Sequence, residues 1–171
     1  MDFHAEAIEP RRDALVLGEE DAPIQVVEYL NLACPSAKAY FELAAEVLMP
    51  AVKEGRVVRY LKHFDKKKAP LERGNELYRY LDLSRPTETY ALMEDIYKTQ
   101  DQWKKMSADA FSTYLKDQGL EEQPDALERR ARMLQEVEAA GVVEIPTCFV
   151  NGRPVRNADL TRRNLENWLA D

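Results

Sequence analysis

The chain has 171 residues, of which 45% are hydrophobic and 32% charged, and its formal net charge is −7. A chain of this length can fill one hydrophobic core but is too short for two independent ones, so we expect a single domain over residues 1–171. No segment approaches the roughly 18 uninterrupted apolar residues that a membrane-spanning helix requires. The negative charge argues against a general nucleic-acid binder, so we expect neither a membrane nor nucleic acid as a partner.

Cysteine and histidine side chains, the usual zinc ligands, are few and scattered. Cys34 and Cys148 lie far apart, and the histidines are His4 and His63, of which His63 ends a predicted strand and is assigned no role. This spacing gives neither a disulfide framework nor a metal-ligand cluster, and we predict no metal. Residues 1–9 lack the basic and apolar regions of a secretory signal. We therefore expect a cytoplasmic protein, or a secreted one if a leader has been removed.

Two segments near the start of the chain are predicted strands. Residues 15–17 are typical of a short edge strand that stops at Gly18. Residues 24–30 are rich in β-branched and aromatic side chains, which favours a central strand covered on both faces. Glu28 is the single charge in that strand. Because a buried carboxylate is costly unless it is paired or protonated, Glu28 either lies at the rim of the sheet or is a functional acid with a raised pKa, and the residues alone favour the rim.

A cysteine follows this strand at the predicted start of a helix. Pro35 is typical of a first helical residue, and Cys34 then lies at the positive end of the helix dipole, where a thiolate is favoured over a thiol. This is the layout of a thiol nucleophile. The alternative is a small apolar cysteine that happens to precede a helix.

The helix that starts at Pro35 carries one apolar face, with apolar residues at three- and four-residue spacing as far as Ala51. Pro50 should kink this helix or end its regular part, and Gly55 should cap it. Residues 56–64 then have strand character, which predicts a strand-helix-strand unit with a parallel, right-handed crossover.

A basic run and four predicted helices follow. Lys66, Lys67 and Lys68 form either a local anion contact or a solvated loop. Helix signals are found at residues 70–82, 86–103, 107–119 and 124–141, with Ser107 as the cap of the third helix. We expect them to form a helical subdomain over about residues 66–141.

Strand character returns at residues 142–150, and Asn151-Gly152 is a strong signal for a two-residue hairpin turn. Pro146 removes a ladder donor, so it lies at a strand start, at an edge or in a special turn that contains a cis peptide bond. Because only about 5–6% of X-Pro bonds are cis, this proline by itself would be expected trans. Asp159 is predicted to cap a last helix.

In this order the features resemble the DsbA-like branch of the thioredoxin fold. The resemblance rests on Gly18 with Asp21-Ala22-Pro23, Glu28 six positions before Cys34, Cys34-Pro35, Gln100-Asp101-Gln102-Trp103, and the run from Ile145 to Gly152. It implies an α/β, thioredoxin-like fold in which a central mixed sheet is flanked by helices and carries an inserted helical subdomain. The thioredoxin-fold parts would be about residues 14–65 and 142–171.

The resemblance also implies roles for individual residues, and it reverses the readings of Glu28 and Pro146 that the residues alone favour. Cys34 would be the catalytic nucleophile and Glu28 the buried catalytic acid beneath it. Pro146 would be a cis-proline beside Cys34, and the Ile145 backbone would pair with a bound peptide or thiol. The implied substrate-binding residues are Pro35, Ser36, Ile145, Pro146 and Thr147.

The family motif is Cys-x-x-Cys, and here Ala37 stands at the second cysteine position. No disulfide can form within the motif, so the usual two-cysteine cycle is not open to this chain. What remains is monothiol chemistry: the Cys34 thiolate attacks a disulfide, forms a mixed disulfide and is released by an external thiol such as glutathione. The expected partners are protein or small-molecule thiols and disulfides, and we expect no cofactor, with glutathione as a candidate co-substrate.

Three functions follow from these residues. The first is a thiol-disulfide oxidoreductase or isomerase that acts through Cys34 alone. The second is a redox-inactive peptide-binding adaptor or chaperone that keeps the groove beside Pro146. The third is a glutathione-dependent isomerase or transferase, which saturable glutathione binding would support.

Two expectations concern buried side chains. With no opposite charge among the immediate sequence neighbours of Glu28, the substitution Glu28→Gln should stabilise the fold. If Pro146 packs against Cys34, as the resemblance implies, strand alternation places Cys148 on the same face two residues further on, which is too far from Cys34 for a disulfide. Cys148 should then be a reduced core thiol beneath the first helix.

Overall fold

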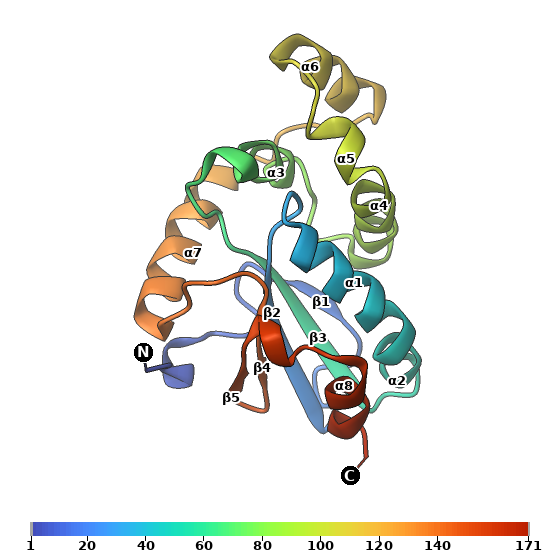
Figure 1. Ribbon diagram of the computed structural model, residues 1–171, viewed down its shortest axis with the longest axis vertical. Helices are drawn as coiled ribbons and strands as arrows, with labels where there is room; N and C mark the ends of the chain where they lie inside the picture. Colours follow the sequence, from blue (N-terminus) through green and yellow to red (C-terminus); the bar gives the residue numbers. More distant parts are fainter. Residues whose placement is uncertain (1, 171) are drawn as a thin grey trace.

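The computed structural model describes residues 2–170, which build a five-stranded mixed sheet with helices on both faces (Figure 1). The strands are β1 (Leu15–Leu17), β2 (Ile24–Leu30), β3 (Val57–His63), β4 (Thr147–Val150) and β5 (Arg153–Val155). Their order across the sheet is β1-β3-β2-β4-β5. Strands β2 and β3 are parallel and the other neighbouring pairs are antiparallel, which confirms the predicted strand-helix-strand unit at the centre of the sheet.

The helices form two layers. One face of the sheet is covered by α1 (Pro35–Val47), α2 (Met49–Lys53), α4 (Pro86–Lys98) and α8 (Arg162–Trp168). The other face is covered by α7 (Ala126–Ala140) and by the N-terminal segment with its short 3-10 helix η1 (Ala5–Ala7). The remaining helices, α3 (Glu72–Tyr78), α5 (Gln100–Trp103) and α6 (Ala108–Asp117), lie beyond the end of β2 from which the chain enters α1 (Figure 1).

Strand β2 is covered on both faces, as its composition predicts. Val26 and Leu30 belong to the core under α1, whereas Val27 and Tyr29 belong to the core under α7. Because successive side chains of a strand point to opposite faces, Glu28 points to the α1 face. No helix among residues 2–170 is long and apolar enough to cross a membrane.

The break between α1 and α2 lies where Pro50 predicts one. Helix α1 ends at Val47, and Pro50 stands in the first turn of α2, where its missing N–H has no intrahelical partner to lose. Gly55 follows α2 in the left-handed region, with φ +77°.

Two of the predicted helices are shorter or divided. Within residues 70–82 the chain forms only α3, preceded by the 3-10 turn η2 (Ala69–Leu71). Residues 86–103 are divided at Thr99 into α4 and α5. Trp103 is fully buried, and its Nε1 donates to the carbonyl of Ile96 at 2.8 Å, which holds α5 against the end of α4.

The two helices that follow differ in how well their starts were predicted. Ser107 caps α6 as predicted, since its hydroxyl accepts from the Ala110 N–H at 3.2 Å. Helix α7 begins at Ala126 rather than at Pro124, and Gly141 ends it with φ +79°.

The C-terminal part contains the predicted hairpin and one wrong cap. Asn151 (φ 48°) and Gly152 (φ 82°) make the tight turn between β4 and β5. The predicted strand 142–150 is shorter, because β4 begins only after Pro146, which has no N–H to donate. The cap of α8 is Thr161, whose hydroxyl accepts from the Asn164 N–H at 3.2 Å. The predicted cap, Asp159, instead ends the 3-10 turn η3 (Asn157–Asp159).

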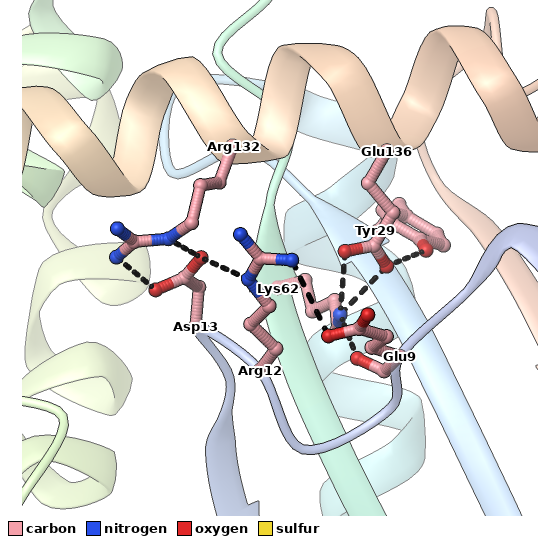
Figure 2. A network of polar contacts seen from close by, with 7 residues as sticks. All are labelled: Glu9, Arg12, Asp13, Tyr29, Lys62, Arg132 and Glu136. Atoms are coloured by element: carbon pink, nitrogen blue, oxygen red, sulfur yellow. Dashed lines mark hydrogen bonds and ion pairs between the residues drawn. The ribbon is translucent and has the colours of Figure 1, made fainter.

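A polar network joins the N-terminal segment to α7 and the sheet (Figure 2). Lys62 of β3 donates to the Glu136 carboxylate at 2.6 Å and to the backbone carbonyl of Glu9 at 2.6 Å. Four residues earlier on α7, Arg132 binds both carboxylate oxygens of Asp13 at 2.7 and 2.8 Å. This network lies on the face of the sheet opposite to α1.

Candidate functional site

Cys34 caps the N-terminus of α1 and faces the segment that precedes β4. Its backbone is extended (φ −85°, ψ 121°), and Pro35 is the first helical residue. The Cys34 Sγ lies 3.8 Å from the carbonyl oxygen of Ile145. The Ile145-Pro146 peptide bond is cis, the isomer that the family resemblance implies. Two segments that are distant in the sequence thus meet at a half-buried thiol.

The other implied substrate-binding residues differ in their exposure. Pro35 and Ser36 are exposed beside Cys34, and Ile145 is half-buried. Thr147 is fully buried, and its hydroxyl donates to the Glu144 carbonyl at 2.8 Å, which closes the turn around Pro146. The structure therefore brings Pro35, Ser36, Ile145 and Pro146 to the thiol but engages the Thr147 hydroxyl in an internal bond.

Side chains of α5 fix the loop in front of Cys34. The Gln100 Nε2 donates to the carbonyls of Leu32 at 2.8 Å and of Cys34 at 3.1 Å. The Lys104 Nζ donates to the carbonyl of Ala33 at 2.8 Å. Three successive carbonyls of the loop thus obtain partners from α5 and from the residue that follows it. Gln100 belongs to a segment that the resemblance singles out, whereas no sequence signal pointed to Lys104.

A second support comes from α3 and the end of β3. The Asn31 side chain accepts from the Ala33 N–H at 2.9 Å and donates to the Phe64 carbonyl at 3.0 Å and to Asn75 Oδ1 at 2.7 Å. A Cβ added at Gly74 would lie 2.6 Å from both the Ala33 nitrogen and Asn31 Oδ1. Helix α3 therefore packs directly on this loop, and that close approach requires glycine at position 74.

His63, to which the sequence assigns no role, is part of this support. It is 5% exposed, its Nε2 lies 3.0 Å from Asn75 Oδ1, and its ring stacks on Tyr78 with centroids 4.3 Å apart. Burial lowers the pKa of His63 to about 4, an effect that Asn75 and Asp65 partly oppose. The ring is therefore neutral at pH 7 and fills a structural position behind the loop.

Cys34 has no partner thiol at its own motif. Ala37 is fully buried one turn into α1, so a methyl group packed in the core occupies the second motif position. Cys148 is free and fully buried in the same core as α1, as predicted. Burial, and after it the Glu28 carboxylate, raises the pKa of the Cys148 thiol well above its ordinary value. Among residues 2–170, no group of three His, Cys, Asp or Glu side chains is placed to hold a metal ion.

Glu28 is paired, which the sequence analysis did not foresee. Both of its carboxylate oxygens accept hydrogen bonds of 2.7 Å from the guanidinium of Arg59, and both side chains are fully buried. Burial by itself would lower the pKa of Arg59, but the Glu28 carboxylate outweighs it and raises that pKa above its ordinary value. The rim position for Glu28 is therefore wrong, and so is the premise of an unpaired carboxylate.

Tyrosine hydroxyls surround this ion pair on the α1 face. The hydroxyls of Tyr40, Tyr90 and Tyr97 and the Nη1 of Arg59 are buried without a hydrogen-bond partner among residues 2–170. Burial, followed by the nearby Cys34 and Glu28, raises the pKa of Tyr97 well above its ordinary value. Tyr97 thus interacts electrostatically with both Cys34 and Glu28.

A sequence signal for Arg59 did exist. The parallel pairing of β2 with β3 sets Val26 opposite Arg59, so Glu28 and Arg59 lie on the same face two residues out of register. Each of the two strands carries one charge on that face, and opposite charges there are expected to pair. Lys104 and Gly74 gave no comparable signal as site residues, because the helical segments that carry them have no predictable position relative to Cys34.

Comparison with known proteins identifies the family and the fold. The model of the thioredoxin family matches residues 11–171, and the chain belongs to this family. It is similar to a conserved protein of unknown function from Enterococcus faecalis V583, with 31% identity, a TM-score of 0.90, and coverage of 100% of this chain and 98% of that chain. No curated protein matches the chain.

Two more distant structures share the fold. The catalytic domain of ScsC from Proteus mirabilis is 16% identical, with a TM-score of 0.71 and coverage of 97% of this chain and 94% of that chain. A protein-disulfide isomerase from Novosphingobium aromaticivorans is 13% identical, with a TM-score of 0.68 and coverage of 92% and 98%. The predicted α/β, DsbA-like thioredoxin fold is therefore confirmed.

Proposed function

We propose that the protein is a thiol-disulfide oxidoreductase or isomerase that acts through Cys34 alone. The observation that carries this proposal is the half-buried Cys34 thiol at the N-terminus of α1, 3.8 Å from the Ile145 carbonyl. Peptide dipoles at a helix N-terminus stabilise a thiolate, which is the nucleophilic form. Ala37 at the second motif position supports monothiol rather than dithiol chemistry.

The chemistry is a sequence of two sulfur exchanges. The Cys34 thiolate attacks one sulfur of a substrate disulfide, the S–S bond breaks, and the departing sulfur leaves as a thiolate that takes a proton from solvent. A second thiolate then attacks the substrate sulfur of the mixed disulfide and expels the Cys34 thiolate. If the second thiolate belongs to the same substrate, the disulfide is rearranged without net oxidation. If it belongs to an external thiol, one further equivalent of that thiol completes the reduction.

Glu28 has a different part in this proposal from the one that the resemblance implies. Protonation of its carboxylate would leave the buried Arg59 guanidinium without a counter-charge, which is costly. The departing thiolate is therefore protonated by solvent, which reaches the half-buried thiol. Glu28 and Arg59 would act as a fixed ion pair beneath the site rather than as a proton carrier.

The test is the formation of a mixed disulfide with glutathione disulfide, followed by intact-protein mass spectrometry. We expect one glutathione adduct on the wild-type protein and on Cys148→Ser, and none on Cys34→Ser. An adduct that persists in Cys34→Ser would contradict the proposal. So would quantitative formation of an internal Cys34-Cys148 disulfide after oxidation with diamide. Glutathione as the natural co-substrate, and the cytoplasmic location, remain predictions.

A second candidate function is a redox-inactive peptide-binding adaptor. It is favoured by the register of the hairpin, in which β5 pairs with β4 only from Cys148 to Val150 and leaves Ile145 and Thr147 without a partner from β5. An added peptide strand could pair there. Tight peptide binding by Cys34→Ser, together with no disulfide exchange by the wild-type protein, would establish this function in place of the first.

A further inference from the structure

The segments around Cys34 carry two anchored lysines. The Lys66 Nζ donates to the carbonyl of Val143 at 2.6 Å, two residues before Ile145. The Lys104 Nζ donates to the carbonyl of Ala33 at 2.8 Å, one residue before Cys34. One ammonium group is thus fixed to each of the two segments that meet at the thiol.

Both ammonium groups retain binding capacity. A lysine ammonium has three donors, and each of these two uses one of them on protein. Among residues 2–170 neither Lys66 nor Lys104 forms an ion pair. Glu144, the nearest acidic residue along the chain to Ile145, is itself paired with Arg156 at 3.9 Å. Two cations that form no ion pair among residues 2–170 are therefore fixed to the segments that flank the reactive sulfur, in a protein whose net charge is −7.

Lys66 lies within electrostatic reach of the thiol. Burial and the neighbouring Lys68 lower the pKa of Lys66, while Glu144 and Cys34 raise it in part. Lys68 adds a further positive charge in the same loop, which is the basic run that the sequence left open between an anion contact and a solvated loop. The anchoring to backbone carbonyls also reduces the entropy that each lysine would lose on binding a ligand.

We propose that Lys66 and Lys104 select disulfides that carry carboxylates close to the sulfur. The inference rests on the proposed function, because it names the substrate class of the same Cys34 site. An approaching carboxylate takes the free donors of the two ammonium groups, and this positions the attached disulfide for attack by the Cys34 thiolate. The rest of the protein, being negatively charged, repels the same substrate, so the lysines provide the local attraction.

Three small disulfides of different charge test this inference: glutathione disulfide, neutral hydroxyethyl disulfide and cationic cystamine. We compare their rates of reaction with Cys34 in the wild type and in the double variant Lys66→Gln, Lys104→Gln. The variant should react about five- to tenfold more slowly with glutathione disulfide, about equally with hydroxyethyl disulfide, and faster with cystamine. A structural loss would slow all three, so this reversal of sign separates charge selection from damage to the loop.

Matched variants complete the design. The pair Lys53→Gln, Lys116→Gln changes the net charge equally at exposed positions of α2 and α6, outside the site, and should leave the three rates unchanged. The conservative pair Lys66→Arg, Lys104→Arg should restore the preference for glutathione disulfide. A comparison of Glu-Cys-Glu with Gln-Cys-Gln peptide disulfides decides whether acidic protein segments are selected as well as small thiols.

The outcomes separate the inference from the function on which it rests. Reaction of Cys34 with all the disulfides at rates that do not depend on their charge would overturn the inference and leave the proposed function standing. Reaction with none of them would overturn both. A charge preference that persists in the double lysine variant would also overturn the inference.

Discussion

Charged residues inside the two central strands find their partners on neighbouring elements. Glu28 of β2 pairs with Arg59 of β3, and Lys62 of β3 pairs with Glu136 of α7. Neither partner is a near neighbour in the sequence. For this reason Glu28 looks like an isolated acid when the sequence alone is considered. The two ion pairs lie on opposite faces of the sheet, so each is a separate contribution to the free energy of unfolding.

The ion pair reverses the effect expected for Glu28→Gln. The sequence predicts a more stable protein, whereas loss of the carboxylate charge would leave the Arg59 guanidinium buried and uncompensated. We expect the free energy of unfolding to fall by roughly 3–5 kcal/mol, measured by urea denaturation at pH 7.

The apolar double variant Glu28→Leu, Arg59→Met is the control for this effect. Because it removes both charges together, it should recover most of the stability that the single variant loses. If Glu28→Gln proves as stable as the wild type, the structural role given to the ion pair is wrong.

His63 makes the stability depend on pH. Its pKa is about 4 in the folded protein against an ordinary value of 6.5. Between these values the unfolded chain binds a proton that the folded chain does not. The free energy of unfolding is therefore highest above pH 6.5 and decreases as the pH falls towards 4. The loss should amount to about 3 kcal/mol.

Urea unfolding at pH 7 and at pH 4.5 measures most of this loss. Carboxylates also respond to acid, so the matched variant is His63→Gln, which keeps a polar side chain at the position but does not titrate. Its free energy of unfolding should fall less than that of the wild type over the same interval. Equal losses in the two proteins would show that His63 does not contribute.

At the scale of elements, the features that depend on the local sequence were predicted correctly. The strand over residues 24–30, the helix start at Pro35 and the helix break near Pro50 follow from propensity and from the chemistry of proline, and all three are confirmed. The division of residues 86–103 at Thr99 was missed, because it depends on tertiary packing of the fully buried Trp103.

The position of α3 against the Cys34 loop leads to a prediction for Gly74. The substitution Gly74→Ala would place a Cβ 2.6 Å from the Ala33 nitrogen and 2.8 Å from the Ala33 Cβ, so helix and loop must move apart. We expect a destabilisation of about 1–3 kcal/mol and a changed rate of Cys34 alkylation. Urea unfolding and iodoacetamide kinetics measure the two effects.

Gly119→Asn serves as the comparison for Gly74→Ala. Position 119 has φ +70° and nothing within 4 Å of an added Cβ, and asparagine tolerates the left-handed region. This variant should leave alkylation of Cys34 unchanged. Normal stability and normal alkylation in Gly74→Ala would mean that the loop accommodates the methyl group without moving.

At the scale of the whole molecule, the network around Lys62 closes the N-terminal segment over the sheet (Figure 2). The Glu136 carboxylate accepts from both Lys62 and the Tyr29 hydroxyl, and Lys62 also donates to the carbonyl of Glu9. One carboxylate thus links α7 to two strands and, through Lys62, to the N-terminal segment at Glu9. No pattern within any single segment predicts this arrangement.

We predict that Glu136→Ala loosens the N-terminal segment. The Lys62 side chain is fully buried and would lose its counter-charge, so the free energy of unfolding should fall by about 3 kcal/mol or more. Limited trypsin digestion should then cut faster at Arg11 and Arg12. Glu138→Ala, on an exposed position of the same helix, should behave like the wild type. Equal cleavage of the two variants would contradict the prediction.

The candidate site was predictable from the sequence only in part. Cys34-Pro35 and Ile145-Pro146 are short strings whose order along the chain carries information, and the structure brings them together. The side chains that support the thiol, Gln100 and Lys104 among them, come from the helices inserted between β3 and β4. The packing of those helices depends on the complete core, which no local pattern encodes.

The buried methyl group of Ala37 affects how long a mixed disulfide at Cys34 lasts. In a two-cysteine enzyme the second thiol limits the life of a mixed disulfide from within, but here the second motif position holds a methyl and the remaining thiol, Cys148, is sealed in the core. Under the proposed function, a complex at Cys34 whose substrate supplies no attacking thiolate of its own therefore lasts until a thiol arrives from outside. Its dwell time should vary inversely with the concentration of that thiol, so the fraction of protein held in complexes becomes a readout of the thiol supply around it.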